Sequence, residues 1–431
     1  MGIARTFRIR KNDSPLRKGM RISVYEGLPA VIFMNFLSGP FLTGYLLYLG
    51  ATSQQIGIVL AVPALANLVQ IAMAMISQRL ENRKAALIVF FSIHRVIAIS
   101  TGLIPFLFPE KLWVIIYILV YSIAYISLSA GSLFLTSLFS DMVPPQVRGQ
   151  FFGIRNTIHG AVSSLFLFVG GVVLEKYPGG TGFNILYIVS AIMVVVNLVL
   201  LAFYPNPKFE KSNENRMGLI LLKPFRDRLF LNAMLFLSLW MLLQGTALPF
   251  FSYVMLNLMH ISYQWVSIVT IIQTVFSMVG FVIWGNLNMK YSNKKLLFWT
   301  LPIIALCCLV WGTMAFLPVI LVLIVAHMLL GFGIGGFNQL VFNFVIGDTP
   351  KAERPIYIAV FSGITGLAGF GGPMLGGYIF DILKDTQEWV QSYGVFTATG
   401  IILLVFAFTV GLAVLRDKPS EPISHSNARQ H

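Results

Sequence analysis

Charged residues and cysteines are scarce in this sequence of 431 residues, and acidic residues are especially so. Only 11% of the residues are charged, with 16 Asp and Glu against 30 Lys and Arg, and there are two cysteines. A soluble domain averages about 25% charged residues. The shortage of charge excludes an ordinary soluble enzyme and a disordered chain. The two cysteines, Cys307 and Cys308, are adjacent within an apolar run, which excludes a secreted disulfide scaffold.

The sequence is instead rich in apolar residues, which make up 57% of it and give a mean hydropathy of +0.81. One soluble core cannot hide so much apolar surface. The apolar residues form continuous runs of about 20 residues, the length that crosses a bilayer as a helix, and not short alternating strands. We therefore expect an all-α integral membrane protein. The twelve predicted spans are 22–49, 54–78, 85–108, 112–138, 151–175, 183–204, 229–256, 265–287, 296–316, 319–345, 355–383 and 393–415.

Lysine and arginine predict the orientation of these spans. The loops on one side of the membrane, counted with both termini, hold 25 of the 30 basic residues, whereas the opposite loops hold only Lys111, Lys176 and Lys384. Basic residues accumulate in cytoplasmic loops, so both termini are predicted to lie in the cytoplasm, with the protein in the cell membrane. The dilute basic charge forms no patch interleaved with aromatic residues, which argues against nucleic acid as a partner.

The chain divides into two similar halves. Segment 74–84 aligns with 285–295 at an offset of 211, and Pro144 and Arg148 match Pro350 and Arg354 at an offset of 206. Because each half has six spans, both enter the membrane in the same orientation, as a parallel repeat. The predicted organisation is a cytoplasmic segment 1–21, a six-helix bundle 22–204, a cytoplasmic linker 205–228, a second six-helix bundle 229–415 and a cytoplasmic tail 416–431.

Two loop motifs add a resemblance to a known family. The pattern G-x-x-x-[DE]-[RK]-x-G-[RK]-[RK] has degenerate copies at 74–84 and 285–295, and Asp141, Pro144 and Arg148 follow the fourth span. With twelve spans in a repeat of six and six, the chain resembles the major facilitator superfamily over about its whole length. The resemblance implies two halves related by a pseudo-two-fold axis along the membrane normal, and secondary transport of a small organic solute by alternating access.

The resemblance also predicts a cytoplasmic gate. The acidic position of the family motif is Gln78 in the first copy and Met289 in the second, so the latch that the acid forms in the family is expected to use other contacts or to be weaker. The residues predicted to form the gate loops are Arg79, Arg83, Lys84, Asp141, Arg148, Lys290, Lys294 and Lys295.

Ionisable residues inside spans are candidates for proton coupling, since each costs about 2.5–3.5 kcal/mol to place in a membrane. Glu26 lies near the start of the first span, and Arg155 and His159 lie at a similar depth on one face of the fifth. We predict a protonatable Glu26 balanced by Arg155, with His159 as a second titrating group. The alternative is an interfacial Glu26 and an Arg155 that extends to the membrane surface without meeting it.

His94 and Arg95 lie near the middle of the third span. Arg95 is either a structural residue satisfied by backbone carbonyls or polar side chains, or an anion-binding residue that reaches the cavity. His327 in the tenth span is either a neutral, hydrogen-bonded side chain or a substrate contact.

Neutral polar residues also mark several spans, where they either join helices or face a wet cavity. As a set they predict a mostly neutral polar cavity with aromatic walls, which suits an uncharged or amphipathic organic solute. The candidates for this cavity are Asn35, Gln70, Tyr125, Gln244, Gln273, His327, Asn338 and Asn343.

The predicted function is therefore secondary active transport of a small organic solute, coupled to protons, by a monomer in the lipid bilayer. A multidrug or metabolite efflux antiporter and an uncoupled uniporter remain open, as do a membrane-embedded lipid-modifying enzyme and a channel. No Walker A sequence is present, so ATP hydrolysis by this chain is not expected. No cofactor, metal site or catalytic residue is predicted.

Overall fold

The computed structural model describes residues 14–70, 72–73, 82–206, 223–347 and 354–415, and these residues contain helices and turns but no strand. Within this described part of the chain, ten helices are long and apolar enough to cross a membrane, and Ser53–Ala66 is a shorter apolar helix. Together with Arg354–Ile382, they account for the twelve predicted membrane crossings.

The first six crossings are built from eight labelled helices. These are α2 (Pro15–Phe36), α3 (Gly39–Tyr48), α4 (Ser53–Ala66), α6 (Arg83–Ser100), α7 (Ile104–Leu107), α8 (Trp113–Met142), α9 (Pro145–Lys176) and α10 (Gly180–Ala202). The second six follow the short α12 (Lys223–Arg226). They are built from α13 (Arg228–Gly245), α14 (Phe251–Tyr253), α15 (Tyr263–Leu287), α16 (Asn293–Gly312), α17 (Val319–Gly347), α18 (Arg354–Ile382), α19 (Val395–Phe406) and α20 (Leu412–Val414).

Capping residues explain why several helices begin where they do. The first helix begins at Pro15 and not at the predicted residue 22, because the Ser14 hydroxyl accepts a hydrogen bond from the Arg17 amide and proline suits the first helical position. Thr52 and Gln55 form a reciprocal capping box at the start of α4. The predicted loop 139–150 is also shorter than expected, since α8 ends at Met142 and α9 begins at Pro145.

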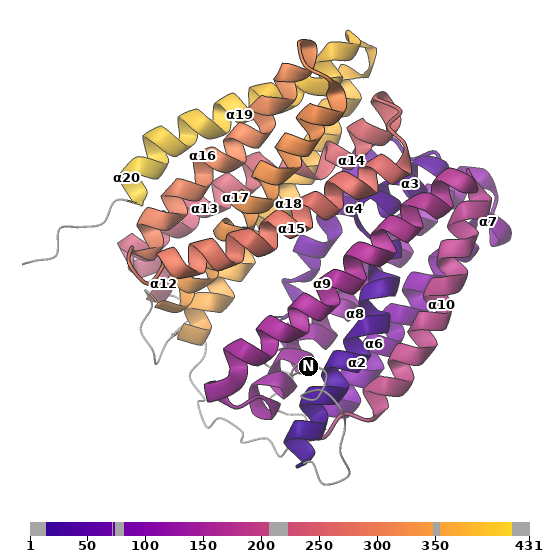
Figure 1. The fold of residues 1–431 in the computed structure, drawn as a ribbon, viewed down its shortest axis with the longest axis vertical. Coiled ribbons are helices and arrows are strands. Elements are labelled where there is room, and N and C mark those ends of the chain that lie inside the picture. The colour runs from indigo at the N-terminus through magenta and orange to yellow at the C-terminus, as the bar shows by residue number, and fades with distance from the viewer. Residues whose placement is uncertain (1–13, 71, 74–81, 207–222, 348–353, 416–431) are drawn as a thin grey trace, which may run out of the picture.

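The helices form two bundles that meet at one end and diverge at the other (Figure 1). Helices α2 to α10 make one bundle and α13 to α20 the other, with α3, α4, α14 and α18 where the bundles meet. We call the diverging end, which carries Arg83, Lys84 and Lys290, the basic end, and the other the opposite end. The first-half bundle is called the N-half and the second the C-half.

The hydrophobic core follows the same division. At the opposite end one cluster joins residues of both halves, for example Phe41 and Leu46 with Phe250 and Val266. Toward the basic end each half has a cluster of its own, one around Phe134 and the other around Phe230. The two halves therefore share a core only where they meet.

Glycines allow the closest contact between the halves. A Cβ atom at Gly57 of α4 would lie under 3.0 Å from the Pro373 carbonyl oxygen of α18, and one at Gly377 would lie under 3.0 Å from the Ser53 carbonyl oxygen. A Cβ at Gly171 of α9 would likewise collide with Ser267 of α15. We call these two contacts the α4/α18 seam, where backbone packs against backbone, and the α9/α15 seam, where backbone packs against the Ser267 side chain. Only glycine permits so close an approach.

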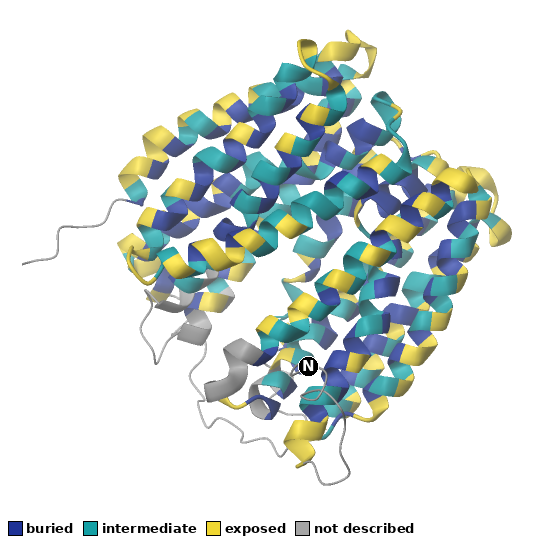
Figure 2. Cartoon of the chain, viewed as in Figure 1, coloured by how far each residue is buried: buried dark blue, intermediate teal, exposed yellow. Residues whose placement is uncertain are grey.

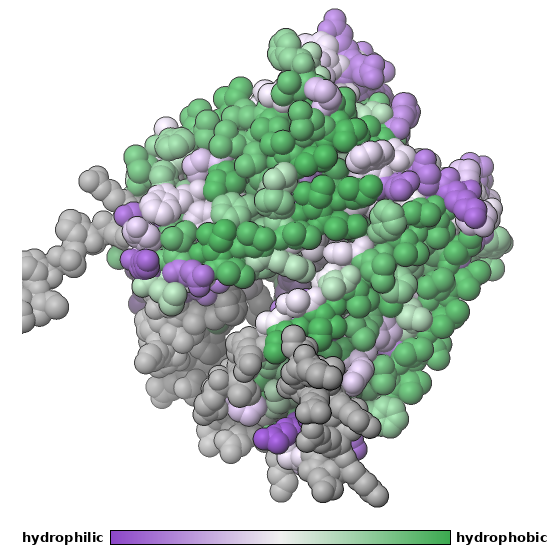
Figure 3. Space-filling model, in the orientation of Figure 1, coloured by the Kyte–Doolittle hydropathy of each residue, from purple (hydrophilic) through white to green (hydrophobic). Residues whose placement is uncertain are grey.

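The outer surface of both bundles is apolar. Exposed residues face outward along the helices in Figure 2, and hydrophobic residues cover most of the coloured part of the face shown in Figure 3. Many of them are large aliphatic side chains, such as Val96, Leu119 and Ile188, which are more than half exposed. A surface of this kind suits a lipid environment.

Candidate functional site

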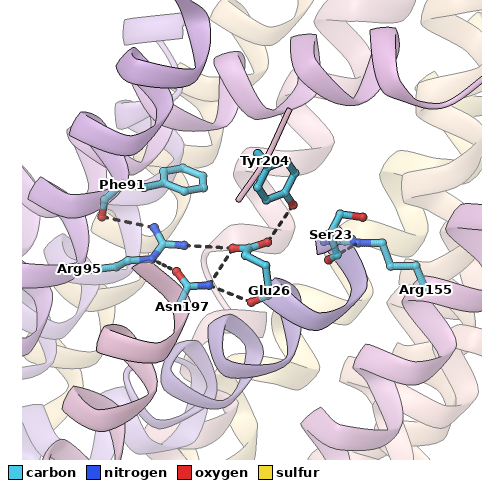
Figure 4. A network of polar contacts seen from close by, with 7 residues as sticks. All are labelled: Ser23, Glu26, Phe91, Arg95, Arg155, Asn197 and Tyr204. Carbon is cyan, nitrogen blue, oxygen red and sulfur yellow. Dashed lines mark hydrogen bonds and ion pairs between the residues drawn. The ribbon is translucent and has the colours of Figure 1, made fainter. Parts of the chain in front are cut away.

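A buried polar network in the N-half joins four residues that are far apart in sequence (Figure 4). Glu26 comes from α2, Arg95 from α6, Asn197 from α10 and Tyr204 from the segment directly after α10. The Arg95 Nη2 atom lies 3.8 Å from Glu26 Oε1, and Arg95 Nε donates to Asn197 Oδ1. Asn197 Nδ2 donates to Glu26 Oε1 at 2.7 Å, and the Tyr204 hydroxyl donates to Glu26 Oε2 at 3.1 Å.

Both charged members of the network are removed from solvent, with Glu26 and Arg95 each 3% exposed. A buried charge is tolerated only when it is paired and hydrogen-bonded. Arg95 also donates to the Phe91 carbonyl oxygen at 3.3 Å, and its guanidinium carbon lies 4.3 Å from the centre of the Phe91 ring. The guanidinium therefore keeps neutral partners besides the carboxylate of Glu26.

Arg155 and His159 lie beside this network but contact the backbone of α2. Arg155 Nε donates to the Ser23 carbonyl oxygen at 3.3 Å, and His159 Nε2 lies 3.0 Å from the Val24 carbonyl oxygen. The His159 ring fits against α2 because Gly27 has no side chain there. Glu26, Arg155 and His159 therefore lie in one region, as predicted, but the cation paired with Glu26 is Arg95 and not the predicted Arg155.

The physical reason for this difference is the direction of the Glu26 side chain. Glu26 faces α6 and α10, whereas α9 lies against the part of α2 that presents the Ser23 and Val24 carbonyls. Of the two interpretations of Arg95, the structure agrees with a residue satisfied inside the N-half, although its acidic partner was not foreseen. Asn197 and Tyr204 were also missed; an amide within the apolar run 183–204 was the available signal.

His94 faces a tyrosine cluster on α8. It lines a cavity of about 10 Å³, the size of one water molecule, together with Tyr117, Tyr121 and Tyr125. The His94 and Tyr125 rings meet edge to face at 6.1 Å, and the Tyr121 and Tyr125 ring centres are 4.4 Å apart. His94 Nδ1 is buried without a hydrogen-bond partner among the described residues.

Most of the predicted cavity residues are joined to neighbours. Asn35 exchanges hydrogen bonds with Ser163 across α2 and α9, and Gln70 donates to Ser129 of α8 at 3.1 Å. Trp240 donates to Gln244 at 3.0 Å within α13. These amides are partly buried, so they join helices while retaining some exposed surface.

The cavity candidates of the C-half are more dispersed. Gln273 is partly buried on α15 and Asn338 is exposed on α17. Asn343 donates to Asn288 at 3.0 Å, which places it beside the turn after α15. His327 is 2% exposed, and its Nδ1 atom lies 2.7 Å from the Leu323 carbonyl oxygen, which agrees with a neutral, hydrogen-bonded histidine.

The predicted gate residues are described only in part. Arg79 lies outside the described residues, and the side chains of Asp141 and Arg148 are not described although both residues lie on helices. Arg83 is buried and Lys84 partly buried at the start of α6.

In the C-half copy of the gate loop, lysines lie over aromatic rings. Lys290 is exposed, Lys294 Nζ lies 5.9 Å from the Phe344 ring centre, and Lys295 Nζ lies 4.9 Å from that of Tyr291. Cation–π contacts of this kind hold both amines near the turn.

The space-filling view shows a hollow between the two halves on the side where they diverge, bordered by pale and purple residues (Figure 3). The charged groups described above do not lie in the contacts between halves: Glu26, Arg95, Arg155 and His159 all have partners within the N-half. No group of three or more His, Cys, Asp or Glu residues among those described could hold a metal ion.

Replacing Tyr204 by phenylalanine tests the network. The change keeps the ring but removes the hydroxyl that donates to Glu26 Oε2. Hydrogen bonds to charged groups contribute about 1.5–3 kcal/mol, so we expect a clear loss of thermal stability in detergent, measured by the melting temperature. The control is Tyr291→Phe, at an exposed ring near the basic end. An unchanged melting temperature for Tyr204→Phe would show that the hydroxyl is not needed.

Comparison with known proteins agrees with this architecture. The family description "Major Facilitator Superfamily" matches residues 30–346 and 241–430. No curated protein matches the chain by sequence. The solved structure of the nucleoside transporter NupG is similar at 15% identity, covering 94% of this chain and 100% of that one, with a TM-score of 0.67.

Two further solved structures are similar at the level of the fold. A D-xylose-proton symporter is 15% identical over 92% of this chain and 98% of its own, with a TM-score of 0.69. A bacterial homolog of the human lysosomal transporter Spinster, inward-facing and unoccupied, is 14% identical over 94% and 98%, with a TM-score of 0.65.

These findings define a multi-pass membrane transporter with two six-helix bundles and not an enzyme. The chain belongs to the major facilitator superfamily. Its partners are therefore a small-molecule substrate and the lipids of a membrane, and its activity is secondary transport.

Proposed function

We propose that this transporter moves a small organic solute without net charge by alternating access, and that proton coupling depends on Glu26. The observation that supports a neutral solute is where the charged side chains of the N-half lie. Within the N-half spans, Glu26, Arg95, Arg155 and His159 are tied to partners inside that half, whereas amides such as Asn35 and Gln70 stay partly exposed. The nucleoside transporter and the xylose symporter that share the fold handle neutral polar solutes of this kind.

We also propose that the basic end faces the cytoplasm of a cell-membrane protein that acts as a monomer. The loops at this end carry most of the lysine and arginine residues, as cytoplasmic loops do. The divergence of the halves at this end then corresponds to an inward-open state (Figure 1). Closing it would require the seams α4/α18 and α9/α15 at the opposite end to separate.

Glu26 suits proton coupling because its partner Arg95 has other contacts that remain when Glu26 is neutral. Without the carboxylate charge, Arg95 retains the Asn197 oxygen, the Phe91 carbonyl and the face of the Phe91 ring. Glu26 lies on α2, and α2 also carries Asn35, which bonds Ser163 of α9. Protonation of Glu26 would thus change the contacts of a helix that also presents candidate solute-binding groups.

The substrate class is tested by a thermal-shift screen of the purified protein. Panels of nucleosides, sugars, amines and organic acids are compared at two pH values, because a ligand stabilises the folded state by mass action. We expect stabilisation by a neutral polar solute. Stabilisation confined to multivalent anions would contradict the proposal.

Replacing Glu26 by glutamine tests the coupling. If Glu26 binds a proton during transport, its neutral form must fold, so we expect a stability loss of no more than about 1–2 kcal/mol. Accumulation driven by a pH gradient should be lost in proteoliposomes, while exchange of labelled solute at equal concentrations survives. The control is Glu110→Gln, at an exposed acid between α7 and α8.

Two outcomes would contradict the coupling proposal. Uphill transport by Glu26→Gln at the parent rate would remove Glu26 from the mechanism. A loss of about 3–5 kcal/mol, typical of a broken buried ion pair, would make Glu26 a fixed structural partner of Arg95.

A further inference from the structure

A second cavity lies at the opposite end of the molecule, far from the polar network. Its volume is about 500 Å³, within the range of about 300–1,000 Å³ typical of small-molecule sites. Both halves contribute to its lining: Tyr48 and Glu175 come from the N-half, and Asn257, His260 and Tyr263 from the C-half. The cavity therefore exists as one space only while the halves are together at this end.

The lining has the chemistry of a site for an organic cation. Glu175 supplies a carboxylate, and no lysine or arginine among the described residues lines the cavity. The amine of neighbouring Lys176 lies 5.5 Å from the centre of the Tyr177 ring, and neither of these two residues lines the cavity. A carboxylate without a cationic partner favours a ligand that brings a positive charge.

Aromatic rings form much of the remaining wall. The Tyr48 and Phe183 ring centres are 5.6 Å apart, and the Phe183 and Tyr263 rings meet edge to face at 6.2 Å across the two halves. Such rings accept both an apolar ring and an ammonium group near their faces. The Asn257 amide and the Ser262 hydroxyl add neutral hydrogen-bonding groups.

His260 fixes the shape of the C-half wall. Its φ is +52°, and it is the one non-glycine residue with positive φ in the described part of the chain. This left-handed conformation turns the chain sharply between the segment ending at Leu258 and the start of α15. The turn holds Tyr263 against Gly44, where a Cβ atom would collide with the tyrosine ring.

We propose that this cavity binds a small aromatic amine in its protonated form, with the ammonium group at Glu175 and the ring among Tyr48, Phe183 and Tyr263. Because the occupant contacts both halves, it binds the state in which they meet at this end and not the state in which they separate. A ligand that prefers one state raises its population. Such an amine is thus an inhibitor that holds the basic end open. The binding does not depend on the transport cycle proposed above, whereas the inhibition rests on it.

The binding test uses phenethylamine and its N-acetyl derivative, which has the same ring but no positive charge. We expect phenethylamine to raise the melting temperature of the purified protein and the N-acetyl compound to have little effect. Glu175 is exposed, so Glu175→Gln should weaken phenethylamine binding by no more than about fivefold, as expected for an exposed ion pair. Glu175→Asp keeps the charge and should stay within about twofold of the parent.

A matched control removes another acid from the same end of the molecule. Asp385 is exposed and does not line the cavity, so Asp385→Asn should bind phenethylamine like the parent. Failure of the parent to bind phenethylamine would overturn the proposal. Equal binding by Glu175→Gln would also overturn it, because the amine would then bind elsewhere, for example between the halves at the basic end.

The conformational effect is measured by the distance between spin labels at Lys18 and Met289, which are exposed in the N-half and the C-half at the basic end. The native Cys307 and Cys308 are fully buried and should not react with the label. Phenethylamine should increase the fraction of molecules with a long distance between the two labels in the parent but not in Glu175→Gln. Binding without a change of population would refute the inhibitory role.

Discussion

Replacing Arg95 by methionine is expected to remove most of the folded protein. The change keeps an extended apolar side chain but leaves the Glu26 carboxylate, which is 3% exposed, without its cation. Breaking a buried ion pair in this way costs about 3–5 kcal/mol. Asn197 would lose its acceptor role toward Arg95 Nε at the same time. The measurement is the yield of monodisperse protein in detergent and its melting temperature.

Two further variants separate the ion pair from general packing. Arg155→Met removes a guanidinium that contacts the Ser23 carbonyl and the Phe139 ring, with no carboxylate within ion-pair distance among the described residues, and should cost far less. Glu26→Gln combined with Arg95→Met removes both charges, so it should recover much of the stability lost by Arg95→Met alone. A double variant as unstable as Arg95→Met would show that the pair is not the source of the loss.

The sequence was sufficient for the fold because its signals are local or repeated. Twelve apolar runs give the crossings, and the offset between 74–84 and 285–295 gives the repeat. The errors lie at helix ends, where polar residues extend a helix beyond the apolar run. Ser14 and Pro15, for instance, start α2 before the first apolar stretch, because capping and not hydropathy decides the boundary.

The site was harder to predict because the hydropathy of a span does not show which face of its helix points toward which neighbouring helix. Glu26, Arg95 and Arg155 were each visible as charges within spans, but which pair meets depends on the face that each helix presents. Asn197 and Tyr204 complete the network from a sixth span that is mostly apolar. The cavity lined by Glu175 at the opposite end could not be found from the sequence, since it forms only where the two halves come together.

Replacing Gly57 by valine is expected to abolish the conformation seen here while leaving the protein folded. A Cβ atom at Gly57 would lie under 3.0 Å from the Pro373 carbonyl oxygen, and backbone atoms of α18 cannot turn aside as a side chain can. Overpacking of this kind costs about 1–3 kcal/mol, which changes a two-state population ratio by about 5- to 150-fold. The cost falls only on the state in which α4 and α18 touch at the opposite end, so the variant should move to the state in which they separate.

Spin labels at Lys18 and Met289 provide the measurement, since the distance between them should shorten when the basic end closes. Gly153→Val is the matched control, because no atom lies within 4 Å of its Cβ position among the described residues. The control should keep the distances of the parent, while Gly57→Val should lose the long-distance population and transport together. If Gly57→Val instead retained the parent distances and rate, the α4/α18 seam would not be the contact that holds the opposite end closed. If both variants shifted alike, the effect would come from valine in a helix and not from the contact with Pro373.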